Sequence, residues 1–194
     1  MTQASVKLSF DDYLTYDNGT DYRYEFVDGE LIQMTPATHR HRRISRYLEE
    51  MLRQEITKAS LRWETARNGE VGVQTRGKTK ITVRLPDVVV FEGETVTDPD
   101  GVAILTVPPL FVVEVVSTGE QNRKRDYEQK SREYQSVGIP EYWIVDPQEA
   151  VQKVTVLLLV DGVYEETEFM GNDRILSATF PNLNLTAEQV LTAN

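Results

Sequence analysis

The sequence contains no cysteine and only two histidines, His39 and His41. The missing thiols exclude disulfide bonds and thiolate metal sites, and two histidines are too few for a histidine-rich zinc cluster. A metal ion bound by this chain would therefore use oxygen ligands, which favours a hard divalent ion such as Mg²⁺ or Mn²⁺. The lack of cysteine also fits a reducing cytoplasm, which is the compartment that we expect.

Long apolar runs are missing as well, since none approaches the roughly 20 residues that cross a bilayer. The first five residues lack the basic start and apolar stretch of a signal peptide, so we expect no membrane association. Positive charge is scarce, with 21 Lys and Arg against 31 Asp and Glu, which gives a formal net charge of −10. This balance argues against broad, nonspecific binding to nucleic acid but leaves room for a local basic patch.

The chain has 194 residues, 40% of them hydrophobic, which is enough for a sizeable core. No internal repeat, low-complexity tract or linker divides it, so we expect one domain over residues 1–194. Residue spacing predicts helices near 9–16, 38–57, 120–136 and after Thr186. It predicts strands near 22–27, 30–34, 63–74, 80–84, 85–91, 110–116, 142–145, 151–160 and 163–169, and a surface loop over 92–109.

The helix near 120–136 lies between two apolar strands, 110–116 and 142–145. This β-α-β unit implies a parallel pair of strands with a right-handed crossover, and the flanking hairpins add antiparallel strands. The predicted class is α/β (α+β), with one mixed central sheet flanked by helices.

Two acidic residues stand inside segments that should be buried. Asp87 lies near the start of the run Leu85–Phe91, and Glu114 lies in the middle of Leu110–Val116. Apolar runs of this kind predict central strands that are covered on both faces. Because an ionised carboxylate is costly in such a place without a partner, two of them on neighbouring strands indicate a cation site.

Lys130 falls on the predicted inner stripe of the helix that follows the Glu114 strand, between Tyr127 and Tyr134. Asp126 precedes Lys130 by four residues and is placed to hold its ammonium group. Two acids and a lysine suit metal-dependent hydrolysis of a phosphodiester, in which the acids bind Mg²⁺ and the lysine orients water or stabilises charge on phosphorus.

Several motifs in this order resemble the bacterial restriction endonuclease family often called Uma-two, a branch of the PD-(D/E)xK nuclease superfamily. The matching segments are 24–31, Met34-Thr35-Pro36 with His41, Pro86-Asp87-Val88, 113–117, Asp126 with Lys130 and Tyr134, and 138–147.

The resemblance implies a restriction-endonuclease-like core and a nuclease that needs a divalent metal. It assigns Asp87 and Glu114 as metal ligands. The superfamily lysine should stand where this chain has Val116, and Lys130 is the expected replacement. Glu30 matches the family's N-terminal acid, and His41 matches a histidine of the family pattern. The expected substrate is DNA, and the expected assembly is a homodimer, for which the apolar hairpin at 154–160 is the one hint in the sequence.

Structural roles for the same residues stay open. Asp87 could pair with Arg84, Glu114 could pair with Lys130 without a metal, and Lys130 could extend past the tyrosines to water. His41 begins a helix with Arg40, Arg42, Arg43 and Arg46, which is either a phosphate-contacting patch or a solvated face. The chain could also be a catalytically inert nuclease fold used for binding or assembly, or a hydrolase of small phosphate esters.

Overall fold

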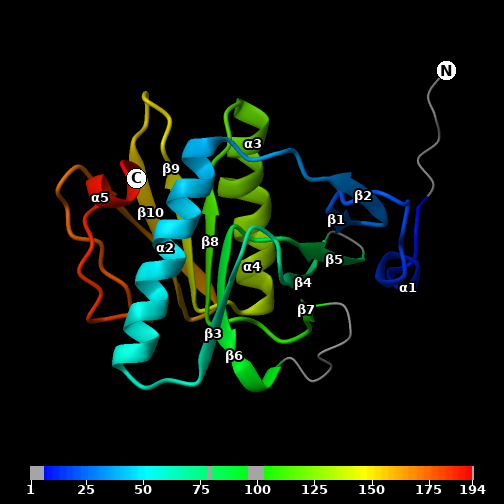
Figure 1. Cartoon of the computed structure of the whole chain (residues 1–194), viewed down its shortest axis with the longest axis horizontal. Coiled ribbons are helices and arrows are strands. Elements are labelled where there is room, and N and C mark those ends of the chain that lie inside the picture. The colour runs from blue at the N-terminus through cyan, green and yellow to red at the C-terminus, as the bar shows by residue number, and fades with distance from the viewer. Residues whose placement is uncertain (1–6, 78–79, 96–102, 194) are drawn as a thin grey trace.

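The computed structural model describes residues 7–77, 80–95 and 103–193, and its strands form two sheets (Figure 1). The six-stranded sheet has the order β11-β10-β9-β8-β6-β3. Its strands, in chain order, are β3 (Trp63–Arg67), β6 (Val88–Glu92), β8 (Phe111–Val115), β9 (Glu141–Asp146), β10 (Lys153–Val160) and β11 (Val163–Met170).

The five-stranded sheet has the order β2-β1-β5-β4-β7. Its strands are β1 (Tyr24–Val27), β2 (Glu30–Gln33), β4 (Gly72–Arg76), β5 (Ile81–Arg84) and β7 (Ile104–Leu105). Because one main sheet was expected, this second sheet is a finding of the structure. The predicted strand 63–74 is divided at Asn68 and Gly69, where the chain leaves one sheet and enters the other.

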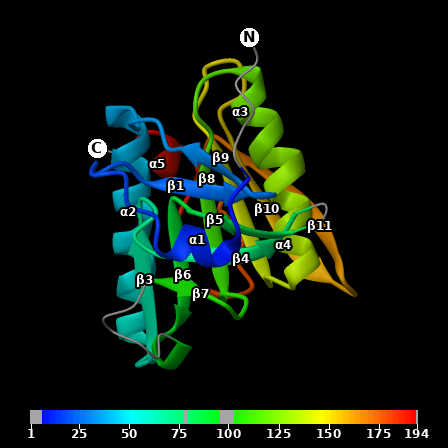
Figure 2. The same ribbon diagram turned by 90° about the vertical axis from the view of Figure 1, so that its right-hand side faces the viewer.

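The helical segments are α1 (Phe10–Leu14), α2 (His39–Lys58), η1 (Gly93–Thr95), α3 (Glu120–Lys124), η2 (Arg125–Lys130), α4 (Ser131–Val137) and α5 (Ala187–Leu191). Figure 2 shows α2 and the α3–η2–α4 segment on opposite sides of the six-stranded sheet. Leu48 of α2 packs in one core with Val88 and Val90, while Tyr134 of α4 packs in the other with Val89. Helices therefore cover both faces of this sheet, as the apolar runs predicted.

The β-α-β unit is confirmed. β8 pairs in parallel with β9, and α3–η2–α4 connects them, while β6 pairs antiparallel with the other edge of β8. Ser9 and Thr186 cap the short helices α1 and α5, and the side chain of each accepts a hydrogen bond from the backbone three residues on. The predicted loop 92–109 contains η1 and β7, and its residues 96–102 lie outside the described part.

One predicted helix contains a feature that its spacing did not reveal. Residues 125–130 form a π turn, which interrupts the α-helical pattern between α3 and α4. Such turns are rare and occur mostly at functional sites. Asp126, Lys130 and Tyr134, spaced by four, are all buried on the sheet side of this segment.

The hairpin that was offered as a hint of a dimer is mostly buried within its own chain. Val154, Val156 and Leu157 pack into the two cores, so the expectation of an exposed apolar strand at 154–160 is wrong there. The tip is exposed at Val160 and Val163, and most of β11 faces solvent, including Met170. The homodimer stays a prediction without this support. In the described part of the chain, no helix is both long and apolar enough to span a membrane.

The α4 helix ends at Gly138, whose φ of 85° lies in the left-handed region, with open space around the missing side chain. We expect Gly138→Ala to lower the free energy of unfolding by about 1 kcal/mol, because an L side chain is strained at this backbone conformation. Gly138→Asn is the matched control, since Asn tolerates this conformation better. Urea unfolding checks both, and an equal loss for Ala and Asn would contradict the explanation.

Candidate active site

Asp87 stands where the chain passes from the five-stranded sheet to the six-stranded sheet, directly before β6. The backbone N–H of Val115 donates to Asp87 Oδ2 at 2.7 Å, and His41 Nε2 lies 2.7 Å from Asp87 Oδ1. Since Glu114 precedes Val115, the two acids predicted as metal ligands lie on neighbouring strands at one edge of the sheet. The alternative pairing of Asp87 with Arg84 is not what the structure shows.

Glu114 is buried and is held by two donors on one oxygen. Lys130 Nζ lies 2.8 Å from Glu114 Oε1, and the Tyr134 hydroxyl donates to the same atom at 2.7 Å. Both donors come from the helix that follows β8, as the inner stripe predicted. The sequence thus placed Lys130 on Glu114 correctly, although the lysine stands sixteen positions after the acid rather than two.

Lys130 is only 1% exposed, so the alternative in which it extends to water is wrong. Its ammonium group also lies 3.1 Å from Glu25 Oε1 and 3.9 Å from Asp126 Oδ1. Asp126 therefore stands beside the ammonium as predicted, at the outer limit of an ion pair. Burying an ammonium group is costly, and three surrounding carboxylates offset that cost here.

Glu25 and Arg84 were not predicted as members of this cluster. Arg84 Nη1 lies 2.8 Å from Glu25, while its Nη2 and Nε contact the two oxygens of Glu133 at 2.6 and 2.7 Å. Arg84 thus joins β1, β5 and α4 behind the lysine. A signal was present, because Glu25 lies in the motif Tyr24-Glu25-Phe26-Val27, but strand alternation does not show that Glu25 and Phe26 are both buried.

Glu30 was expected as the third acid of the site. It stands half-buried at the first position of β2, opposite Val27, and the N-terminal acid of the Lys130 cluster is Glu25. A catalytic role of Glu30 stays a prediction.

His41 is buried near the N-terminus of α2, where the Thr38 hydroxyl accepts its backbone N–H. The interpretation as a solvated helix face holds for Arg42 and Arg46 but not for His41. Burial lowers the pKa of His41, but the hydrogen bond and charge of Asp87 outweigh it, and the net pKa is raised. His41 therefore joins the site through Asp87.

The cluster contains more acidic groups than basic partners, and burial together with this excess raises the pKa of Glu114 and Asp126. Burial raises the pKa of Glu114, and although Lys130 opposes this effect, Asp87 and Asp126 add to it, so that the pKa reaches about 8. The pKa of Asp126 is raised as well, with burial as its main cause. The five carboxylates face three permanent cations. These groups are Glu25, Asp87, Glu114, Asp126 and Glu133 against Arg84, Arg125 and Lys130.

A divalent cation fits this charge balance. Asp126 Oδ2 is buried and has no hydrogen-bond partner among the described residues, so an oxygen ligand is left over beside the two predicted ones. Within the same residues, no three His, Asp or Glu side chains are already arranged as a metal-binding group. The carboxylate oxygens are therefore the right type of ligand for a hard ion. In this structure, however, the side chains form hydrogen bonds and ion pairs with one another.

A mixed sheet covered by helices on both faces, with two acids and a lysine at one edge, defines a restriction-endonuclease-like fold. The family model described as "Uma2: Putative restriction endonuclease" matches residues 10–188, and the chain belongs to this family. The family resemblance seen in the motifs is thereby confirmed.

Among solved structures, the chain is similar to one titled a "putative nuclease belonging to DUF820" from Anabaena variabilis ATCC 29413. The two share 18% identity over 95% of this chain and 98% of that one, with a TM-score of 0.73. At this identity the likeness shows the fold. No curated protein matches the chain.

The Arg84 ion pairs lead to a stability prediction. We expect Arg84→Met to lower the free energy of unfolding by about 3–5 kcal/mol, because it leaves Glu25 and Glu133 without their shared partner. Arg53→Met is the matched control, since Arg53 also pairs with a glutamate but its side chain is 63% exposed. That control should cost at most about 1 kcal/mol. Urea unfolding checks both, and equal losses would contradict the argument.

Glu25 leads to a prediction of pH dependence. Burial raises the pKa of Glu25, but the charges of Lys130 and Arg84 outweigh it and bring the pKa to about 2. An acid whose pKa is lowered by folding stabilises the fold above its ordinary pKa of about 4.5, and this contribution is lost as the pH falls toward 2. Wild type should therefore be more stable than Glu25→Gln at pH 7, and the difference should shrink below pH 4.5. A constant difference in the thermal midpoint would contradict this.

Proposed function

We propose that the chain is a divalent-metal-dependent nuclease that hydrolyses DNA phosphodiester bonds. The observation that supports it most is that Lys130 pairs with Glu114 while Asp87 accepts the backbone N–H of Val115, the residue next to Glu114. Two adjacent carboxylates and an ammonium group are what in-line attack on a phosphodiester requires besides positioning. Family membership and the nuclease named in the similar structure support the same reaction class.

The contacts of each residue suggest its role in this reaction. Asp87 and Glu114 would hold Mg²⁺ or Mn²⁺, and the buried Asp126 Oδ2, which has no hydrogen-bond partner among the described residues, is a further oxygen donor. A bound ion would act as a Lewis acid toward the phosphoryl oxygen. Lys130, held by Glu25 and Glu114, provides positive charge for the negative charge that develops on phosphorus. His41 fixes one oxygen of Asp87, and Tyr134 fixes one oxygen of Glu114.

Cleavage of both strands of duplex DNA needs two active sites, so we infer that the chain acts as a homodimer of single-domain subunits. We also infer that this nuclease acts in the cytoplasm.

A catalytically inert nuclease fold is the second candidate, and a specific observation favours it. Both oxygens of Asp87 already have protein partners, and Lys130 and Tyr134 share one oxygen of Glu114. A domain that used this cluster only for its own stability would look the same. Binding of Mn²⁺ separates the two candidates, because the inert domain gains nothing from the ion.

The nuclease proposal predicts cleavage of supercoiled plasmid DNA by wild type in the presence of Mg²⁺ or Mn²⁺. We expect Asp87→Asn and Glu114→Gln each to lower the rate by about 10²-fold or more, since each removes a charged ligand. Lys130→Met should lower it by a similar factor through lost charge stabilisation. Gel assays of plasmid relaxation and linearisation measure these rates.

Glu166→Gln is the control, because Glu166 is an exposed acid on β11 away from the cluster. It should cleave as wild type does. Calorimetry with Mn²⁺ provides the measurement that does not depend on turnover. Cleavage that survives loss of both Asp87 and Glu114 would refute the site, and wild type that binds no Mn²⁺ would favour the inert domain.

A further inference from the structure

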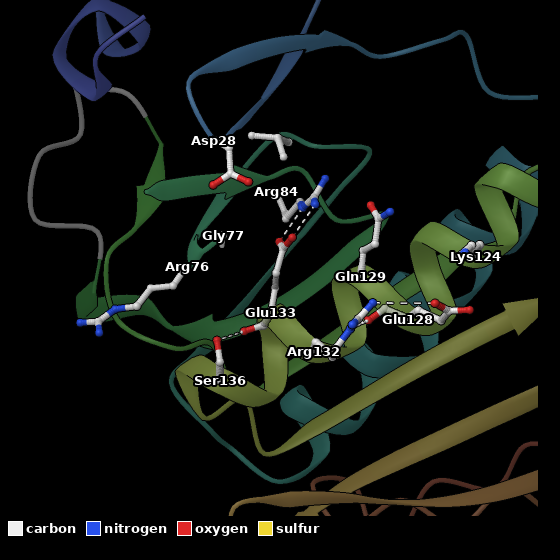
Figure 3. Close-up of a pocket in the computed structure, with 11 residues that line it drawn as sticks. Asp28, Arg76, Gly77, Arg84, Lys124, Glu128, Gln129, Arg132, Glu133 and Ser136 are labelled. Carbon is white, nitrogen blue, oxygen red and sulfur yellow. Dashed lines mark hydrogen bonds and ion pairs between the residues drawn. The ribbon is translucent and has the colours of Figure 1, made fainter. Parts of the chain in front are cut away.

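A cleft of about 820 Å³ lies between the five-stranded sheet and the α3–η2–α4 segment (Figure 3). Gly77 and Arg84 line it from the sheet, and Lys124, Gln129 and Glu133 line it from the helical segment. A volume of this size is within the usual range for ligand-binding pockets, roughly 300–1,000 Å³. None of the residues predicted for the active site lines this cleft.

The lining carries positive charge although the whole chain is strongly acidic. Arg76, Lys124 and Arg132 are exposed, whereas the acid at the centre of the cleft, Glu133, is paired through both oxygens with Arg84. The four basic lining residues outnumber the three acidic ones by one, on a chain with a net charge of −10. The basic residues are Arg76, Arg84, Lys124 and Arg132, and the acidic residues are Asp28, Glu128 and Glu133. The cleft therefore suits an anion.

The cleft adjoins the active-site cluster through Arg84 and Glu133, which belong to both. Arg84 lines the cleft and also contacts Glu25, which in turn contacts the ammonium group of Lys130. Gln129 precedes Lys130 in the π turn, and its side chain points into the cleft in Figure 3 while Lys130 is buried in the cluster. The cleft is thus separated from the groups proposed to act on a phosphodiester only by the layer of residues that contains Arg84 and Glu25.

The cations are spread along the cleft rather than gathered at one point. Figure 3 shows Arg76 and Lys124 at opposite ends of it, and they come from different elements, β4 and α3. A single phosphate cannot contact both, whereas successive phosphates of one strand can. The uncharged donors Gln129 and Ser136 lie between them along the helical wall.

We propose that this cleft binds the phosphate backbone of a nucleic acid strand beside the phosphodiester that the Asp87–Glu114–Lys130 site cleaves. The inference rests on the proposed function for the identity of the polyanion. Lys124 and Arg132 provide the exposed charged contacts, with Arg132 also paired to Glu128, and Arg84 keeps Glu133 from repelling the strand.

The test measures binding of a short labelled oligonucleotide, single-stranded and duplex, by fluorescence anisotropy in EDTA, so that no cleavage occurs. Three double variants each remove two positive charges from the chain. Lys124→Gln with Arg132→Gln changes the cleft, Arg42→Gln with Arg46→Gln changes the N-terminal face of α2, and Lys58→Gln with Arg62→Gln is a control at the far end of α2. All six residues are exposed, and unchanged thermal midpoints verify folding.

We expect the cleft variant to weaken binding about tenfold at ~0.1 M salt and to reduce the salt dependence by roughly one to two ionic contacts. The Lys58/Arg62 control should stay within about twofold of wild type. It loses the same number of charges as the cleft variant but keeps the charges of the cleft. Gln129→Glu, which adds a negative charge to the cleft wall, should weaken binding in the same direction.

Equal affinities of the cleft variant and the Lys58/Arg62 control would overturn the proposal. So would a loss confined to the Arg42/Arg46 variant, because the strand would then run over α2, or an absence of binding by wild type. These outcomes do not depend on cleavage. If wild type cleaves DNA but the cleft variant binds DNA as tightly as the control, only the cleft proposal is refuted. If the cleft variant loses affinity but wild type never cleaves DNA, only the nuclease proposal is refuted.

Discussion

The buried ammonium group of Lys130 is the constraint on which the rest of the site depends. Removing a charged group from water costs several kcal/mol, and the fold offsets this cost only by bringing carboxylates to it. Glu25 comes from β1, Glu114 from β8 and Asp126 from the π turn, so the one charge ties both sheets and the connecting helix together. Each acid in turn is acceptable inside the protein because the lysine is there.

The passage of the chain between the two sheets positions the second half of the site. Arg84 ends β5 and faces Glu25 and Glu133, while Asp87, three residues on, faces His41 and the Val115 amide. The backbone N–H groups of Asn68 and Gly69 hold this crossing by donating to the carbonyls of Asp87 and Pro86. The short connection between β5 and β6 thus places Arg84 on one side of the cluster and Asp87 on the other.

Much of this arrangement was accessible from the sequence, because apolar runs, capping residues and turns are local signals. The strands around Asp87 and Glu114 and the crossover helix were predicted correctly, and so was the meeting of Glu114 with Lys130. The second sheet and the π turn were not predicted. The second sheet depends on contacts between residues far apart in the chain, such as Phe26 of β1 with Val83 of β5, which no short window of sequence contains.

The sequence by itself determined which residues must find partners inside the protein, since an acid in an apolar strand cannot remain alone. Only the tertiary structure decided which residues those partners are. Glu25 rather than Glu30 reached the lysine, Arg84 paired with Glu133 rather than with Asp87, and His41 became buried although its neighbours Arg42 and Arg46 stayed in water. Partner choice follows from the distances set by packing of the two sheets against one helical segment, and spacing along the chain does not encode those distances.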